Sequence, residues 1–249
     1  MGVVIKGRAI VAGGNPRMKV PVTGIQAGTL AVGSTVKLME SGTAVEYLVV
    51  NQGIPSNSNL YDASCDGTWL LRKNIHSNRQ WHTSDLNKYE SSAINTWLNG
   101  DFFNTLGSAE QAAIKQVKIP YRKNGGSGGT DQSGANGLSA KIFLLSGYEV
   151  GWTTSNNPYF PQDGAKLSYF EPGTGTSANN KRIAKLGGSP TGWHLRSPDK
   201  SSDDRTWYVD LNGADSSYYA TNSQGIRPAL VLRSNALFDG KTMLLRGLA

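Results

Sequence analysis

The sequence predicts an α+β fold in which short antiparallel strands and a few helices are joined by long loops, behind a small β-rich extension. Of the 249 residues, 38% are hydrophobic and 17% are charged, both below the shares usual in globular domains. Glycine alone accounts for 30 residues, and Gly, Ser, Asn and Thr build turns rather than helices. No apolar run approaches the roughly 18 residues of a membrane span, so helix bundles and membrane proteins are disfavoured.

Short apolar runs bounded by turn residues predict strands through the opening third of the chain. Glycine, asparagine and proline separate several of these runs. The expected strands cover residues 3–5, 9–11, 18–22, 35–38, 45–50 and 68–71. We expect residues 1–33 to form a β-rich attachment or oligomerisation segment, and residues 34–249 to form the main domain.

Helix signals are confined to the middle of the chain. The apolar residues of 93–98 share one helical face, and Asn-Gly ends the pattern. Asp101 is expected to cap a short turn that carries two phenylalanines. Ser108 and Gln111 have the spacing of a capping box, which predicts a helix over 108–114.

The second half of the chain alternates between loops and short strands. Residues 124–137 form a Gly-rich stretch that is typical of a long surface loop. Residues 141–146 are almost continuously apolar, which predicts a strand buried on both faces. The stretch 151–192 is expected to be mostly loop. Four strands that we expect to pair as one compact antiparallel sheet then follow, at 193–196, 206–211, 217–220 and 226–232.

The net charge of +7 does not predict nucleic-acid binding, because the basic residues are scattered. Their only local group, within 115–123, runs into a Gly-rich loop and accompanies no recognisable nucleic-acid module. By contrast, residues 199–215 hold five aspartates against Lys200 and Arg205, a local charge of −3. That acidic stretch would repel phosphate, so no nucleic-acid partner is expected.

Common catalytic signatures are missing from the sequence. The three histidines, at 76, 82 and 194, lack the spacing of a zinc site. The single cysteine, Cys65, lies between two aspartates that would raise its pKa, which favours a structural thiol. We therefore expect no enzymatic activity and no cofactor. A glycosidase carboxylate pair stays open, and Asp203–Asp204 is interpreted as a solvated loop or a calcium contact.

A polar and aromatic segment at 199–223 is the strongest candidate for ligand binding. It interleaves one tryptophan and three tyrosines with Ser, Asp and Asn. Antibody paratopes use the same mixture, and aromatic faces beside polar groups also suit sugars. Alternation along a strand would send Trp207 and Val209 to the core and Tyr208 to the surface, which is compatible with a binding role.

Five sequence motifs carry a resemblance to a known family. In order, they are Thr68-Trp-Leu-Leu71, Ile94-Asn-Thr-Trp-Leu-Asn-Gly-Asp-Phe-Phe103, Lys141-Ile-Phe-Leu-Leu-Ser-Gly-Tyr-Glu149, Trp193-His-Leu-Arg-Ser-Pro198 and Gly225-Ile-Arg-Pro-Ala-Leu230. Over about residues 45–237 the chain resembles a domain family of uncharacterised function common in gut Firmicutes and their phages. That family is related to the C-type-lectin-like fold of the formylglycine-generating enzymes.

The resemblance implies the C-type-lectin-like fold, with Trp193, Arg196 and the Arg227–Pro228 strand as scaffold. Formylglycine-generating enzymes depend on an active-site cysteine pair, which Cys65 alone cannot supply. The resemblance therefore does not imply their activity.

Related phage and prophage proteins of this fold serve as receptor-binding tips. Some are targets of diversity-generating retroelements, which mutate adenines near the end of the gene. Most residue types between the Arg-Ser-Pro and Ile-Arg-Pro-Ala motifs are reachable from asparagine codons in this way, but Lys200 is not. The resemblance implies a non-enzymatic, tail-associated phage virion protein that binds a host-surface glycan or protein through residues 34–249. We further expect other virion proteins as partners, and a homotrimer. If the protein is not part of a virion, we expect an extracellular or cell-surface location.

The expected ligand contacts all lie in the last quarter of the chain. They are His194, Asp199, Lys200, Ser201, Ser202, Asp203, Asp204, Arg205, Trp207, Asp210, Asn212, Asp215, Ser216, Ser217, Tyr218 and Tyr219. Two alternatives stay open: a structural capsid or tail decoration protein without a receptor, and a bacterial surface polysaccharide hydrolase. No membrane insertion is expected.

Overall fold

The computed structural model describes residues 24–56 and 58–249. Within these ranges the fold is α+β, with small, mostly antiparallel sheets and short helices. The three strands expected before residue 24 lie outside the described residues, as does most of the predicted attachment segment. In the described ranges, no helix has the length and apolar character that crossing a membrane requires.

Five antiparallel strands form the central sheet. In spatial order they are β10 (Ile142–Phe143), β17 (Ala229–Leu232), β4 (Thr68–Arg72), β3 (Thr43–Gln52) and β2 (Thr35–Glu40). The strands expected at 35–38, 45–50 and 68–71 are confirmed as β2, β3 and β4. Ser41 and Gly42 join β2 to β3 in a two-residue turn with φ values of 47° and 79°, which glycine adopts most easily.

The second five-stranded sheet holds half of the predicted ligand contacts, and the others lie in the loops that join its strands. Its order is β15 (Asp215–Tyr219), β14 (Arg205–Val209), β13 (Trp193–Pro198), β16 (Ser223–Gly225) and β5 (Asn78–Gln80). The expectation that 226–232 also joins this sheet is wrong, because β17 pairs with β4 of the central sheet. The strand beside β13 is instead β16, which runs parallel to it. Pro228 cannot donate a ladder hydrogen bond, and the chain passes from one sheet to the other there.

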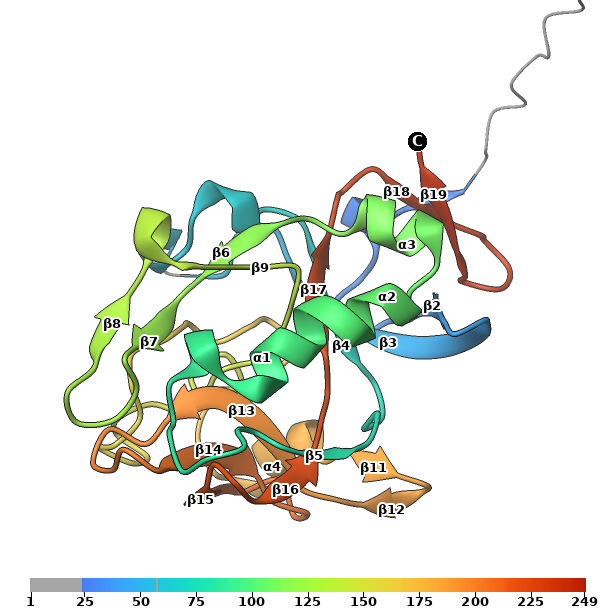
Figure 1. Ribbon diagram of the computed structural model, residues 1–249. Helices are drawn as coiled ribbons and strands as arrows, with labels where there is room; N and C mark the ends of the chain where they lie inside the picture. Colours follow the sequence, from blue (N-terminus) through green and yellow to red (C-terminus); the bar gives the residue numbers. More distant parts are fainter. Residues whose placement is uncertain (1–23, 57) are drawn as a thin grey trace, which may run out of the picture.

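The helical residues in the middle of the chain form one nearly continuous stretch. It comprises α1 (Ala93–Trp97), the π-helical turn η5 (Leu98–Phe102) and α2 (Phe103–Thr105), and α3 (Ser108–Ala113) follows. Figure 1 shows this stretch running in front of β4 and β17. The expected cap at Asp101 is wrong, because helical backbone continues through it. The expected capping box is also wrong: Gly107 is the N-cap of α3 and no side chain caps it.

The remaining elements are short. A three-stranded sheet contains β1 (Ile25–Gln26), β18 (Ala236–Phe238) and β19 (Leu245–Leu248). Three strand pairs are β6 (Val117–Ile119) with β9 (Leu138–Ala140), β7 (Tyr121–Lys123) with β8 (Thr130–Gln132), and β11 (Lys185–Leu186) with β12 (Ser189–Pro190). Single turns of 3₁₀ helix are η1 (Ala27–Thr29), η2 (Ser58–Leu60), η3 (Ala63–Cys65), η4 (Tyr89–Ser91) and η6 (Gly134–Asn136).

Three segments that the sequence marks as loop or strand differ in detail. The Gly-rich stretch contains β8 and η6, so it is more ordered than a plain loop. The stretch 151–192 is mostly irregular, but it includes the helix α4 (Thr176–Arg182). Residues 142–146 are buried as expected, although only the first two pair as a strand.

The segment ahead of residue 33 packs onto the main domain where it is described. Strand β1 pairs with β18, and Ala27 and Leu30 belong to the hydrophobic core. Residues 25–30 are therefore part of the same packed unit as the chain that follows.

Candidate ligand-binding site

A fully buried ion pair lies behind the second sheet. Arg196 of β13 pairs with Glu149 through two contacts, Nη1 to Oε2 at 2.5 Å and Nη2 to Oε1 at 2.6 Å, and neither side chain is exposed. The guanidinium also donates to the backbone carbonyls of Pro120, Leu144 and Asp163 at 2.7–2.9 Å. Because all of its donors are used inside the protein, Arg196 is scaffold, as the family resemblance implies.

Two other residues of the motifs are buried in the same region. Trp193 is fully buried, and its indole N–H donates to the carbonyl of Arg182 at 2.9 Å. Arg227 lies with its guanidinium carbon 4.6 Å from the centre of the Trp193 ring. Its Nε donates to the carbonyl of Arg72 at 3.1 Å. Both residues therefore act as scaffold rather than as ligand contacts.

Three of the predicted contacts are placed in the interior, which corrects the predicted contact set. His194 is 2% exposed, with Nε2 3.1 Å from the Arg79 carbonyl oxygen, and burial lowers its pKa to about 4. Trp207 is 3% exposed, and its ring centre lies 4.2 Å from that of Phe160. Asp199 is 5% exposed. These side chains cannot reach a ligand on the surface of this structure.

The carboxylate of Asp199 instead shapes the loop that follows it. Its Oδ1 accepts hydrogen bonds from the N–H and the hydroxyl of Ser201 at 2.8 and 2.7 Å. The Asp199 N–H donates to the Arg205 carbonyl at 2.9 Å, which closes the loop where β14 begins. Asp199 therefore positions the exposed residues of 200–204 without touching a ligand itself.

Asn87 fixes the same loop from a distant part of the chain. It is 1% exposed, and its Nδ2 donates to the carbonyls of Ser202 and Arg205, both at 2.7 Å. Its backbone N–H donates to the Asp203 carbonyl at 3.0 Å, and its Oδ1 accepts the Gly126 N–H at 2.8 Å. One buried amide thus joins the loop to the Gly-rich stretch.

The Gly-rich stretch packs closely against this loop. A Cβ atom at Gly126 would clash with the Asp203 carboxylate and would lie 2.7 Å from the Ser202 carbonyl oxygen. The Asp203 Oδ1 accepts a hydrogen bond from the Ser127 N–H at 2.9 Å. Asp203 is therefore partly occupied in holding the two loops together.

Two exposed tyrosines stand beside this loop, on the edge strand β15. Tyr218 is 48% and Tyr219 is 38% exposed, and their rings meet edge to face with centres 5.6 Å apart. Arg205 pairs with Tyr219 across the β14–β15 ladder, with its guanidinium carbon 4.8 Å from the ring centre. The Ala220 N–H donates to the Asp204 carbonyl at 2.8 Å, which brings the loop to this end of the strand. We name Asp203, Asp204, Arg205, Tyr218 and Tyr219 the tyrosine face.

Lys200, Ser201 and Ser202 lie in the loop before β14, whereas Asp210, Asn212 and Asp215 lie at the far end of the β14–β15 hairpin. Asp215 and Tyr219 are four residues apart on β15, which corresponds to about 14 Å at a strand rise of about 3.4 Å. The Asp210 Oδ1 accepts the N–H groups of Asn212 and Ala214, both at 2.8 Å, so it shapes the turn. Ser216 and Ser217 lie between the two ends. The structure therefore divides the predicted set rather than gathering it into one site.

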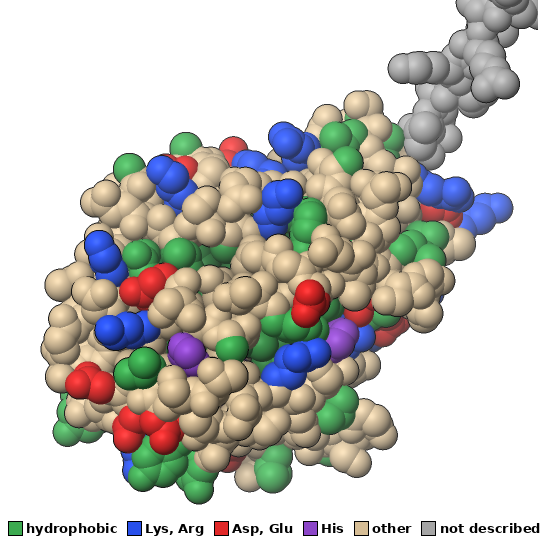
Figure 2. Space-filling model, viewed as in Figure 1, with side chains coloured by type: hydrophobic (Ala, Val, Ile, Leu, Met, Phe, Trp, Pro, Cys, Tyr) green, Lys and Arg blue, Asp and Glu red, His purple; other side chains and the backbone are tan. Residues whose placement is uncertain are grey.

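Sequence reasoning missed a cavity beside the tyrosine face. It has a volume of about 290 Å³ and is lined by Leu86, Lys88, Asn124, Gly128 and Asp203. Leu86 is 45% exposed. As a large apolar residue within a polar loop, it was the one sequence signal that could have indicated this cavity. In Figure 2, acidic and hydrophobic side chains lie together at the lower left of the molecule, whereas Lys and Arg are spread over much of the visible face.

Two groups whose pKa values are strongly raised by burial lie away from the surface. Burial raises the pKa of the Cys65 thiol to about 12, and the buried Sγ donates to the Lys118 carbonyl at 3.2 Å, which agrees with a structural thiol. Burial raises the pKa of Asp163 to about 7, and its Oδ2 accepts the Ser197 hydroxyl at 2.7 Å. Neither group lines a described cavity. Among the described residues, no three His, Cys, Asp or Glu side chains are grouped to hold a metal ion.

Comparison with known proteins identifies one family. No curated protein and no solved structure matches this chain. Residues 66–234 match a domain of unknown function, DUF6273, and they make up more than half of the chain. The matched residues include all five sequence motifs in full, with β4, the helical stretch and the whole second sheet. The chain therefore belongs to the DUF6273 family.

Proposed function

We propose that the chain is a non-enzymatic ligand-binding domain that holds a host-surface glycan or protein on the tyrosine face. The observation that carries this proposal is the pair of exposed, mutually contacting rings of Tyr218 and Tyr219 on an edge strand. A tyrosine offers a rigid apolar ring and a hydroxyl, so it gains contact area at a low cost in conformational entropy.

The surroundings of these rings support recognition of a polar ligand. Arg205 stacks on Tyr219 and keeps hydrogen-bond donors at the edge of its guanidinium. The carboxylates of Asp203 and Asp204 add acceptors beside it. Because Asn87 and Asp199 hold the loop by hydrogen bonds to its backbone, these groups are positioned before a ligand arrives. Such preorganisation lowers the entropy lost on binding.

The finer assignment rests on the resemblance carried by the five motifs. It supports a C-type-lectin-like identity for the fold and a place on the tail of a phage particle. It also supports diversification of the segment between Pro198 and Gly225, because that segment contains the exposed residues of the tyrosine face. Such a protein would act in the virion or at the cell surface, with other virion proteins as neighbours.

The test compares the full chain with a double variant, Y218A/Y219A, in binding to intact Firmicute cells and to immobilised cell-wall glycans. Removal of both rings should reduce retention at least about tenfold, since stacked aromatic contacts commonly contribute a large share of binding energy. The matched control is V32A/L248A, which removes two side chains of 38% and 40% exposure that lie outside the tyrosine face.

Thermal unfolding of each variant would establish that the fold is retained. Equal retention of the wild-type chain and Y218A/Y219A would contradict the proposed site. Release of soluble saccharides from the cell-wall glycans would contradict the non-enzymatic function and favour a polysaccharide hydrolase.

A further inference from the structure

A second cavity lies at the opposite edge of the sheet that carries the tyrosine face. It has a volume of about 360 Å³, near the lower end of the range of about 300–1,000 Å³ for small-molecule sites. Its lining comes from β5, the following loop, α1 and β16: Asn78, Arg79, Gln80, Thr83, Ala93, Ile94, Trp97 and Ser223. Its lining shares no residue with the tyrosine face, although the two lie near each other where the His82 N–H donates to the carbonyl of Ala220, the residue after Tyr219, at 2.9 Å.

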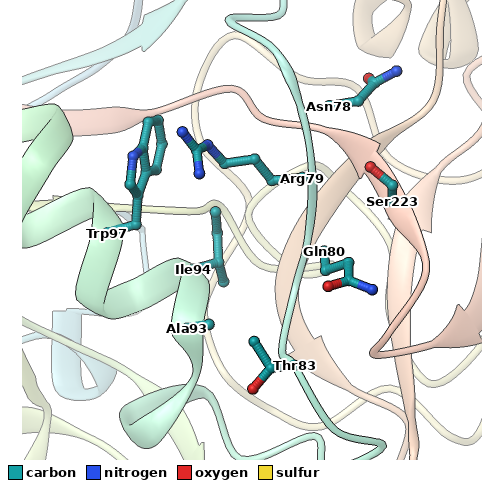
Figure 3. Close-up of a pocket in the computed structure, with 8 residues that line it drawn as sticks. All are labelled: Asn78, Arg79, Gln80, Thr83, Ala93, Ile94, Trp97 and Ser223. Carbon is teal, nitrogen blue, oxygen red and sulfur yellow. The ribbon is translucent and has the colours of Figure 1, made fainter.

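Arg79 and Trp97 form the centre of this cavity. The guanidinium carbon of Arg79 lies 4.0 Å from the centre of the Trp97 ring, and Figure 3 shows the arginine reaching from β5 toward the indole. The indole itself is held by His76 and Phe102, whose ring centres lie 5.3 and 5.4 Å away. The stack therefore fixes the plane of the guanidinium on a rigid platform.

The donors of Arg79 are free within the described part of the chain. Its guanidinium makes no ion pair and no hydrogen bond to any described residue, although its backbone carbonyl accepts from His194. The buried Arg196, by contrast, uses every donor on protein oxygens. A planar cation whose N–H edge faces a cavity is suited to a carboxylate, which it can bind through two parallel hydrogen bonds.

The rest of the lining is suited to hydroxyl groups. Asn78 and Gln80 carry amides that both donate and accept, and Thr83 and Ser223 carry hydroxyls. The amides of Asn78 and Gln80 and the hydroxyl of Ser223 also have no hydrogen-bond partner among the described residues. Figure 3 places Gln80 and Ser223 on the side of β5 away from Trp97, so a ligand would contact groups on both sides of this strand.

We propose that this cavity binds an acidic sugar, meaning a ring with several hydroxyls and one carboxylate, such as a uronic acid. The carboxylate would pair with Arg79, and the ring hydroxyls would exchange hydrogen bonds with the amides and hydroxyls around it. Arg79 is the one cationic residue of this lining, so the cavity matches a ligand with one negative charge. A ligand with several phosphates would find too few cations to pair with. This site has a lining of its own, separate from the tyrosine face, and it goes beyond the function proposed for that face.

The test is titration of the ¹⁵N-labelled full chain with glucuronate, followed through the Trp97 indole N–H signal by NMR. Glucuronate should shift this signal saturably. Glucose, which lacks the carboxylate, and acetate, which lacks the ring hydroxyls, should each bind at least about tenfold more weakly. Glucose equal to glucuronate would overturn the role of Arg79, and acetate equal to glucuronate would overturn the assignment to a sugar.

Variants test the two properties of the arginine, its charge and its planar shape. R79A should weaken glucuronate binding about 10- to 100-fold, and R79K should recover part of it because the charge is kept while the planar fork is lost. The control R246A removes an exposed arginine of β19 and should bind glucuronate like the wild type. Unchanged binding by R79A would overturn the proposal, as would an equal loss in R246A.

Discussion

Replacing the buried His194 should change how the stability of the domain depends on pH. Burial keeps the pKa of His194 at about 4, below its ordinary value of 6.5. Burial raises the pKa of Asp163 from 3.8 to about 7, against the opposing attraction of Arg196. The two groups therefore titrate over almost the same pH range on folding, and their effects have opposite signs.

The sign and the size follow from proton linkage. Between pH 6.5 and about 4 the unfolded chain protonates His194 while the folded chain does not, so stability is lost as the pH falls. Asp163 holds its proton in the folded chain up to about pH 7, so its contribution is greatest below pH 3.8 and is lost as the pH rises. At about 1.4 kcal/mol per pH unit, each group changes the free energy of unfolding by about 3–4 kcal/mol.

Urea unfolding at several pH values between 4.5 and 7.5 measures this balance in three proteins. In the wild-type chain the two contributions nearly cancel. H194Q keeps a side-chain donor for the Arg79 carbonyl but leaves Asp163 unopposed, so its stability should fall as the pH rises. D163N can still accept from Ser197 and leaves His194 unopposed, so its stability should rise. Curves for H194Q and D163N that run parallel to the wild-type curve would refute the reasoning.

Two further predictions concern other buried groups. E149Q leaves the charge of Arg196 buried without its partner and should reduce the free energy of unfolding by about 3–5 kcal/mol. E46Q is the matched control, because Glu46 pairs with Lys73 at the surface. This substitution should reduce the free energy of unfolding by less than about 1 kcal/mol, and equal losses for E149Q and E46Q in urea unfolding would contradict the prediction. Cys65 should resist iodoacetamide at pH 8 in the native chain and react in urea, because burial raises the pKa of its thiol to about 12. Mass spectrometry measures the alkylation. Rapid alkylation of the native chain would show an accessible thiolate and contradict the prediction.

The positions of strands were predictable from local sequence patterns, but the strands with which they pair in the sheets were not. The apolar runs at 35–38 and 68–71 are strands because neighbouring turn residues bound them and the core buries them. The membership of 226–232 depends on pairing with β4, more than 150 residues earlier, which no local pattern records. The expected capping box does not form because the Gln111 amide donates instead to the carbonyls of Leu106 and Phe103, at 2.9 and 3.3 Å.

Which side chains of the candidate site are buried was predictable where side chains alternate between the two faces of a strand. Trp207 and Val209 are buried and Tyr208 is partly exposed, as strand periodicity requires. His194 was mistaken for a surface residue, because the burial of a polar side chain depends on a distant partner, here the Arg79 carbonyl. The role of Arg79 was not predictable from the sequence. Arg79 and Trp97 are 18 residues apart in the chain, and they meet only because the helix that carries Trp97 packs beside β5.

The way the loop before β14 is held explains how its side chains can serve recognition. Asn87 binds the carbonyls of Ser202, Asp203 and Arg205 through its side chain and its backbone, and carbonyls are present whatever residue occupies these positions. Substitutions at 200–202 would therefore leave the backbone path intact, whereas Asp199 and Asn87 must keep their polar groups. Because Asn87 fixes this loop through its backbone carbonyls, side chains of the binding surface that we propose could change while the loop keeps its path.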